Sequence, residues 1–439
     1  MNEVTGCKRP ACGARPALAC YASRMSVSSP PAAAPGERAA LLSPLLAAIT
    51  LALLFGLQPA TTDLYLPGLP LLTREFATSV STAQLTMSAL ILAFGFGQLV
   101  WGPVADRVGR RPVLLAGLAL YTLAAAAGML AQSMTLLIAA RVLQGAAMAA
   151  AVVVGRAMVR DLYPPHEGAH VMSLGMSGLG IIAISSPLLG GWVTAAWGWR
   201  APFGVVCALS LLIWIWVWRV VPETIRQRNP QALQPALLGA AWRRILAHPG
   251  FRAWAGLTAG TYAGLFMFLA GSSFVYMSVL GLSATAYGLA LSTSSVAYLI
   301  GTVFCRRWLV RHGSIGAVKR AAPFTLIGGL GMAALALAGV QTVWAVLLPQ
   351  LAYAFAHGVH QSCGQAGAVS FFPREAGTAS ALAGFVLAGV AFGVGNLLGQ
   401  LMDDSALPLA LGVAAASIAT ALIAWTRVQS HGLAAPAHA

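Results

Sequence analysis

The fold of this chain is decided around the stretch GPVADRVGRRP at residues 102–112, which lies between two long apolar segments. It gathers one aspartate and three arginines in a sequence in which only 8% of residues are charged. A soluble globular protein carries about 25% charged residues. Charge this scarce, placed between two apolar segments, indicates a tight turn between two helices.

The composition excludes an ordinary soluble protein. The chain has 439 residues, is 58% hydrophobic and has a mean hydropathy of +0.78. Its 26 basic and 11 acidic residues are too few to cover the roughly three soluble domains that such a length would form. Helices satisfy their own backbone hydrogen bonds in lipid, and the alternating pattern of a membrane barrel is absent. The sequence therefore predicts an all-α integral membrane protein.

Twelve apolar stretches are each about long enough to cross a bilayer, which takes about 20 residues. The expected spans are 43–67, 82–104, 111–131, 135–160, 168–195, 200–221, 251–278, 285–308, 317–339, 342–370, 376–402 and 406–427. The two sets of six spans predict two pseudo-symmetric six-helix bundles, a plan typical of transporters.

The basic residues indicate the orientation, because cytoplasmic loops carry an excess of Arg and Lys. With both termini in the cytoplasm, the outer loops hold only Arg74 and Arg200. The inner loops hold Arg107, Arg110, Arg111, Arg160, Arg226, Arg228, Arg243, Arg244, Arg306, Arg307, Arg311, Lys319, Arg320 and Arg374. The net charge of +15 is thus explained by topology, and no nucleic-acid partner is expected.

The expected domains are a disordered cytoplasmic tail at 1–40, a first bundle at 41–221, a linker at 222–250, a second bundle at 251–428 and a tail at 429–439. Translation can start at Met1 or Met25, and no signal peptide is expected. Four prolines interrupt the linker, and its middle, 236–247, is amphipathic and is expected on the inner membrane surface.

The stretch at 102–112 has a physical logic as a conformational latch. We expect Gly102 to allow close helix packing and Gly109 to permit the tight turn. Asp106 can meet a helix N-terminus and pair with an arginine, as can Asp161. The expected latch residues are Gly102, Asp106, Arg107, Gly109, Arg110, Arg111 and Asp161, which could hold the two halves together. The alternative is a plain basic loop that only sets the topology.

The same stretch resembles the signature loop of the major facilitator superfamily. Residues 141–145, RVLQG, resemble an element of that superfamily's drug:proton antiporters, and residues 186–192, SPLLGGW, resemble their motif in the fifth span. Serine replaces the usual glycine at 186. Three further stretches, DLYLPGLP at 63–70, RDLYP at 160–164 and AGTASAL at 376–382, are similar to the Bcr/CflA family of bicyclomycin- and chloramphenicol-type exporters.

The resemblance implies a transporter of the bacterial inner membrane, with both termini cytoplasmic. It implies alternating access that exports small hydrophobic drugs in exchange for protons. The proton gradient is the expected energy source, with no cofactor and no metal, and the protein is expected to act as a monomer in the lipid bilayer. The alternative is a proton-coupled symporter that imports a small metabolite.

Two ionisable residues lie at similar depth inside apolar spans, Asp63 in the first and Arg141 in the fourth. Such residues mark functional sites by default. Burial favours the neutral carboxyl and a nearby guanidinium favours the carboxylate, so an Asp63–Arg141 pair can gain and lose a proton. The two residues are the predicted proton-coupling site, and the alternative is an ion pair that only fixes packing.

The fifth and tenth spans carry further candidates. Pro187 bends a helix, and Gly190 and Gly191 offer a close-packing surface, which in similar proteins seals the outer route; simple helix packing is the alternative. In the tenth span, His357, Gln361 and Gln365 share one helical face. They form either a second protonation or substrate site or a stripe of interhelical hydrogen bonds. The predicted cavity residues are Asp63, Gln144, His357 and Gln361.

Other function classes lack their motifs. Neither of the two lysines, Lys8 and Lys319, lies in a phosphate-binding loop, so a nucleotide-driven pump is not expected. The zinc-protease and serine-hydrolase motifs are absent, so an enzyme is not expected either. Cys7, Cys12 and Cys20 do not have the spacing of a zinc site.

Overall fold

The computed structural model describes residues 42–225, 227–403 and 405–433, which form helices and no strand. The first half contains α2 (Pro44–Asp63), η1 (Leu66–Gly68), α3 (Leu69–Glu75), α4 (Val80–Val108), α5 (Arg110–Met129), α6 (Met134–Leu162), α7 (Pro165–Trp197) and α8 (Ala201–Val220). The predictions on the tail at 1–40, on Met25, on its three cysteines and on Arg226 lie outside the described residues.

The second half follows the linker helix α9 (Pro235–Ala247). It contains α10 (Pro249–Ser273), η2 (Phe274–Val279), α11 (Ala284–Leu337), α12 (Val343–Ser370), η3 (Pro373–Glu375), α13 (Ala376–Leu401), α14 (Leu407–Trp425) and α15 (Arg427–His431). The chain was expected to end as a tail from residue 429. Instead α15 packs back on the bundle, and the Trp254 indole donates to the Gly432 carbonyl at 3.1 Å.

The described helices give the twelve predicted membrane spans. Ten helices are long and apolar enough to cross a membrane. One of them, α11, has 54 residues and contains two spans, because Gly313 interrupts it with a φ of 65°. The twelfth span is α12, which has 28 residues and no acid, Lys or Arg, but is made less apolar by its Gln and His residues. The predicted all-α, twelve-helix fold is confirmed.

Hydroxyl side chains begin many of the helices. Ser43, Ser79, Ser133, Ser283 and Thr342 each precede a span and accept a hydrogen bond from the backbone N–H three residues later. This arrangement satisfies donors that the first helical turn leaves unpaired.

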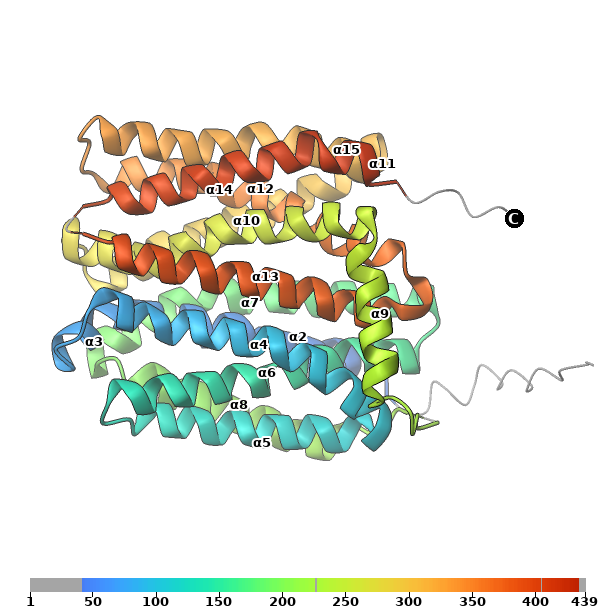
Figure 1. The fold of residues 1–439 in the computed structure, drawn as a ribbon. Coiled ribbons are helices and arrows are strands. Elements are labelled where there is room, and N and C mark those ends of the chain that lie inside the picture. Colours follow the sequence, from blue (N-terminus) through green and yellow to red (C-terminus); the bar gives the residue numbers. More distant parts are fainter. Residues whose placement is uncertain (1–41, 226, 404, 434–439) are drawn as a thin grey trace, which may run out of the picture. The chain divides into compact units, whose positions relative to one another are not determined.

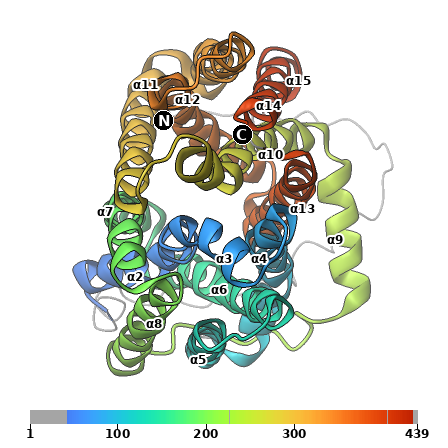
Figure 2. The same ribbon diagram turned by 90° about the vertical axis from the view of Figure 1, so that its left-hand side faces the viewer.

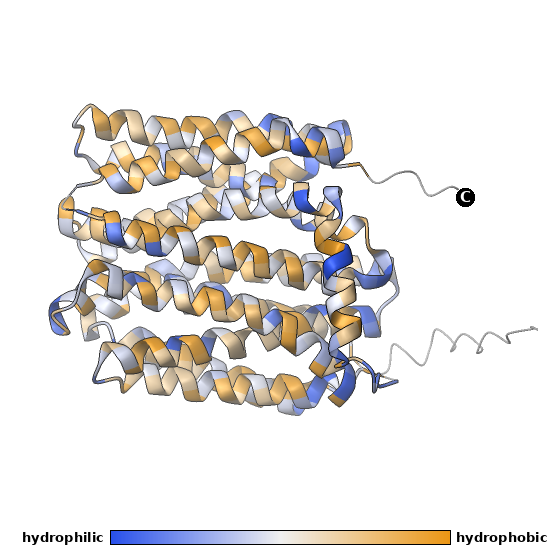
Figure 3. Cartoon of the chain, in the orientation of Figure 1, coloured by the Kyte–Doolittle hydropathy of each residue, from blue (hydrophilic) through white to orange (hydrophobic). Residues whose placement is uncertain are grey.

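The helices run between two ends of different chemistry (Figure 3). We call the end that carries α9 and the turn at Gly109 the basic end, and the end that carries η1 and α3 the opposite end (Figure 1). The linker helix α9 crosses the basic end, where Arg244 forms an ion pair with Glu375 of the second half. An amphipathic helix was predicted at this place in the linker, and the structure contains it.

The two halves meet along two pairs of helices, α4 with α13 and α7 with α11 (Figure 2). Glycines bring these helices close together. A Cβ atom at Gly95 of α4 would lie 2.4 Å from the Ala388 Cβ, and one at Gly384 of α13 would lie 2.6 Å from the Gln98 amide. Because contacts under 3.0 Å require a shift, only glycine fits these positions without rearrangement.

Candidate functional site

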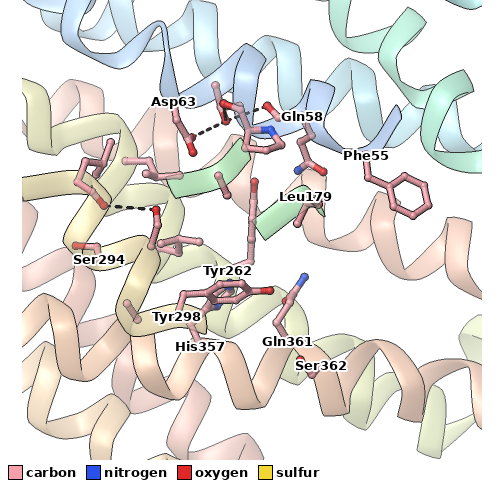
Figure 4. A pocket seen from close by; sticks show the side chains of 18 of the residues that line it. Phe55, Gln58, Asp63, Leu179, Tyr262, Ser294, Tyr298, His357, Gln361 and Ser362 are labelled. Atoms are coloured by element: carbon pink, nitrogen blue, oxygen red, sulfur yellow. Dashed lines mark hydrogen bonds between the residues drawn. The ribbon is translucent and has the colours of Figure 1, made fainter. Parts of the chain in front are cut away.

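A cavity of about 340 Å³ lies between the halves (Figure 4). Helices α2, α6 and α7 line it from the first half and α10, α11 and α12 from the second. Its volume lies within the range of small-molecule sites, about 300–1,000 Å³. Most of its lining is apolar or aromatic, including Phe55, Leu179, Phe268 and Tyr298. Its polar groups therefore define what it can recognise.

Asp63 lies in this cavity at the C-terminal end of α2. The helix ends there because Pro67 has no N–H to donate to the Asp63 carbonyl, four residues earlier. The carboxylate accepts a hydrogen bond from the Thr62 hydroxyl at 2.7 Å. Among the ion pairs of the described residues, none involves Asp63. Asp63 is thus a carboxyl group in apolar surroundings without a cationic partner.

The predicted pairing of Asp63 with Arg141 is wrong for this structure. Arg141 is 1% exposed and lies inside the first half, where its guanidinium donates to the Gln144 Oε1 at 2.9 Å and the Thr61 carbonyl at 3.2 Å. It stacks over the Tyr65 ring at 4.2 Å from the centroid. The two residues were correctly expected at similar depth, but depth does not say which side of α2 each side chain occupies.

Gln144 does not line the cavity either, contrary to the prediction. It is buried and holds Arg141, and both residues border a separate small void within the first half. The segment at 141–145 therefore packs behind α2, through the bond from Arg141 to the Thr61 carbonyl, and does not contribute to the cavity surface.

The polar face of α12 does line the cavity, as predicted. His357, Gln361 and Gln365 all contribute to it. The His357 Nδ1 lies 3.0 Å from the Thr261 hydroxyl, and the Tyr298 ring lies 5.6 Å from the imidazole. The Gln361 Oε1 has no hydrogen-bond partner. His360 points elsewhere, because its Nε2 lies 3.3 Å from the Val318 carbonyl.

Gln350 and Arg156 are among the cavity residues that the sequence did not reveal. Gln350 of α12 is fully buried, lines the cavity and has no partner for either amide atom among the described residues. Arg156 of α6 also lines the cavity, and its Nη1 donates to the Ser380 hydroxyl of α13 at 2.8 Å. The available signal was a second arginine inside the expected span 135–160.

The charged cluster at the basic end confirms the predicted pairs. Arg110 contacts the Asp106 carboxylate at 2.6 Å and the Asp161 carboxylate at 3.0 Å. Gly109 has a φ of 125° and forms the turn between α4 and α5. Arg107 is exposed. Arg111 pairs with no carboxylate and donates to the carbonyls of Val221 and Trp218 at 2.9 and 2.7 Å.

Glu223 is a member of this cluster that the sequence did not reveal. Its carboxylate accepts the backbone N–H groups of Arg110 and Arg111 at 2.9 and 3.3 Å, where α5 begins. An anion at a helix N-terminus is stabilising. The only sequence signal was a scarce acid at the start of the linker.

The predicted latch between the halves is not formed in this conformation, and the expectation for Gly102 is wrong. The charged cluster does not join the two halves, because its contacts lie within the first half and the start of the linker. The contacts that cross between the halves here include Arg156–Ser380. In addition, Gly102 is not a point of close approach, since a Cβ there would meet Val153 at an ordinary 3.6 Å.

The glycines of α7 pack against backbone at the opposite end. A Cβ at Gly190 would lie 2.5 Å from the Leu64 carbonyl, and one at Gly191 would lie 2.4 Å from the Ala284 carbonyl of α11. Reciprocally, Gly288 of α11 packs against the Pro187 carbonyl. The predicted close-packing surface thus packs α7 against the end of α2 beside Asp63 through Gly190 and joins the halves through Gly191 and Gly288, leaving no room for a side chain.

Comparison with known proteins agrees with this architecture. Residues 51–395 match the family model described as Major Facilitator Superfamily. The chain is 31% identical to multidrug resistance protein D of Escherichia coli, over 76% of this chain and 84% of that protein. It is 25% identical to the bicyclomycin resistance protein homolog of Haemophilus influenzae, over 85% and 94% of the two chains.

Among solved structures, a D-xylose–proton symporter shares the fold with a TM-score of 0.70 and 17% identity, over 88% of this chain and 99% of that one. The chain belongs to the major facilitator superfamily, and the resemblance to its Bcr/CflA branch is confirmed by the relatives above.

Proposed function

We propose that this protein exports small hydrophobic drugs of the bicyclomycin or chloramphenicol type in exchange for protons. The observation that carries the proposal is Asp63, a carboxyl group without an ion-pair partner in a largely apolar cavity between the two halves. Such a group can alternate between a neutral and a charged form. A drug and a proton then compete for the same part of the cavity.

The two ends of the bundle take different roles in this proposal. The basic end faces the cytoplasm of the bacterium by the excess of arginine there, and the start of α2 and the end of α15 lie at that end (Figure 1). At the opposite end, the backbone contacts of Gly190 and Gly191 close the outer route directly beside Asp63. The halves then rock to exchange access between the two sides, driven by the proton gradient without a cofactor.

Two predicted site residues take changed roles in this scheme. Arg141 positions the end of α2 through the Thr61 carbonyl and the Tyr65 ring, and it acts on Asp63 only through that helix. The charged cluster around Arg110 holds the turn between α4 and α5 in this conformation. Its action as a latch between the halves belongs to the state in which the basic end is closed.

Transport by purified protein in proteoliposomes tests the proposal. With a pH gradient imposed, the wild-type protein should accumulate radiolabelled chloramphenicol against its gradient, and Asp63→Asn should abolish that accumulation. Asp63→Glu is the matched control, because it keeps a titratable carboxyl group and should retain part of the activity. Normal uphill transport by Asp63→Asn would refute the mechanism, and drug movement in the same direction as the proton would show a symporter instead.

A further inference from the structure

We infer that Arg156 is an anion-recognition site inside the cavity. The transporter would accordingly accept hydrophobic carboxylates and zwitterions, with the anionic group directed toward the basic end. The inference rests on the proposed function only in taking this cavity as the substrate site. It names a class of substrate that the single carboxylate of the cavity would not suggest.

The position of Arg156 gives the cavity two charged poles. The preceding residue, Gly155, packs against the Phe55 ring of α2, with a Cβ there 3.1 Å from its edge. Arg156 therefore lies near the level of Phe55. Asp63 lies two turns further along α2, about 12 Å away at 1.5 Å per residue. The cavity thus has an acid at one end and a guanidinium toward the other, with uncharged polar and apolar side chains between them.

The guanidinium of Arg156 has more donors than partners. Among the described residues, it makes one side-chain hydrogen bond, to the Ser380 hydroxyl at 2.8 Å, and it forms no ion pair. A guanidinium carries five N–H donors in a planar fork that matches a carboxylate. Arg156 is partly buried in the cavity wall and has no opposite charge beside it among the described residues, so an anionic ligand is the complement that this position lacks.

Neighbouring groups on α12 suit the same ligand. Gln361 lines the cavity and leaves its Oε1 without a partner among the described residues, and Gln365 lies one turn further toward the basic end. An amide can turn its N–H groups toward a carboxylate, which would add a third hydrogen bond to the pair of bonds from Arg156. The aromatic rings of Phe55 and Tyr262 provide surfaces for a hydrophobic body between the poles.

The test is a binding measurement with two ligands of the same shape. The affinities of 1-naphthoate and 1-naphthamide are measured by tryptophan fluorescence on the purified full-length protein, in a neutral detergent without added lipid. The wild-type protein should prefer the carboxylate, and Arg156→Gln should reduce the carboxylate-to-amide affinity ratio by about tenfold or more, the range for a charge-assisted bond. Arg156→Lys should keep an intermediate ratio.

Arg160 provides the matched control. It lies one turn further along α6, is exposed and does not line this cavity. Arg160→Gln changes the net charge equally and should leave the affinity ratio at its wild-type value. An equal fall in the ratio for both variants would show a general effect of charge and would overturn the proposal.

The other outcomes are also decisive. If Arg156→Gln keeps the wild-type affinity ratio, or weakens the binding of both ligands equally, Arg156 only forms the hydrogen bond to Ser380 and the inference is wrong. If phosphatidylglycerol added to the detergent displaces the carboxylate in the wild-type protein alone, the anion site belongs to a lipid headgroup, which also overturns it. Binding needs no gradient, so these results stand apart from the Asp63→Asn transport result.

Discussion

The two halves of the molecule carry similar segments that are held by different forces. In the first loop, residues 102–112, the sequence Gly102-x3-Asp106-Arg107 matches Gly301-x3-Cys305-Arg306 in the second loop, residues 301–307 of α11. Carboxylates surround the start of α5 in the first half: the Arg110 guanidinium bonds those of Asp106 and Asp161, and the Arg110 backbone N–H donates to that of Glu223. In the second half, Cys305 takes the place of the acid, and its Sγ lies 3.5 Å from the Cys363 Sγ in a buried contact. No ion pair of the described residues involves this second loop.

The first glycines of the two loops also differ in how closely they pack against a neighbouring helix. A Cβ at Gly301 of the second half would lie 2.0 Å from the Phe355 carbonyl, whereas one at Gly102 would meet Val153 at 3.6 Å. The second loop is therefore held by close packing and the first by charge. Since packed backbone tolerates little movement, the first loop is the one that a change of charge can shift.

The largest effect should come from Arg110→Gln, which removes both ion pairs of the first loop. Arg110 is 8% exposed, so its loss leaves two carboxylates without their cation. We expect a cost of about 2 kcal/mol, a fall in melting temperature of about 2 °C and a loss of transport of about tenfold or more. Thermal melting in detergent and proteoliposome transport measure the two effects.

The matched control lies in the second loop. Arg306 is exposed and takes part in no ion pair of the described residues, so Arg306→Gln should change stability by less than about 0.5 kcal/mol. Equal effects of the two variants would break the comparison, because the two loops would then depend on charge alike.

A smaller effect is expected from Glu223→Gln. The Arg110 and Arg111 N–H groups bond different oxygens of Glu223, so this change keeps one oxygen acceptor, loses the other and removes the negative charge at the N-terminus of α5. The expected cost is about 1 kcal/mol at low salt and less at high salt, since ions screen it. A melting temperature that does not depend on salt in either protein would remove charge as the explanation.

The smallest effect is expected from the double variant Cys305→Ala and Cys363→Ala. Both thiols are buried and contact each other without a charged partner. Transport should stay within about twofold of the wild-type protein, as expected away from charged networks and functional groups. A loss of transport as large as that of Arg110→Gln would show that transport depends on the thiol contact as strongly as on the ion pairs of the first loop.

Much of the fold followed from the sequence, because the bilayer leaves few choices. The positions of the twelve spans, the turn at Gly109 and the helix in the linker could all be predicted from apolar length, glycine and amphipathic pattern. The pairs of Arg110 with Asp106 and Asp161 were also predictable, since scarce charges at one end of a bundle find each other. Glu223 was not, because nothing in the linker sequence indicates that it returns to the start of α5.

The candidate site was predictable only in part. Asp63, His357 and Gln361 were identified because polar residues inside apolar spans are conspicuous, whereas Arg156 was overlooked beside Arg141 on the same helix. Gln144 was predicted in the cavity and Arg141 beside Asp63, but the structure turns both side chains into the first half. Depth in the membrane follows from counting residues, while the direction of a side chain does not.

The sequence by itself determined the class of this protein, its helices and the end of the bundle that carries its charge, because lipid requires apolar helices and confines charge to their ends. Only the tertiary structure decided that Asp63 has no cationic partner, that Arg156 shares its cavity and that the first loop's ion pairs stay within one half. The reason is physical. Which neighbour a residue meets depends on how each helix is rotated about its axis, and the packing of all the helices together sets that rotation.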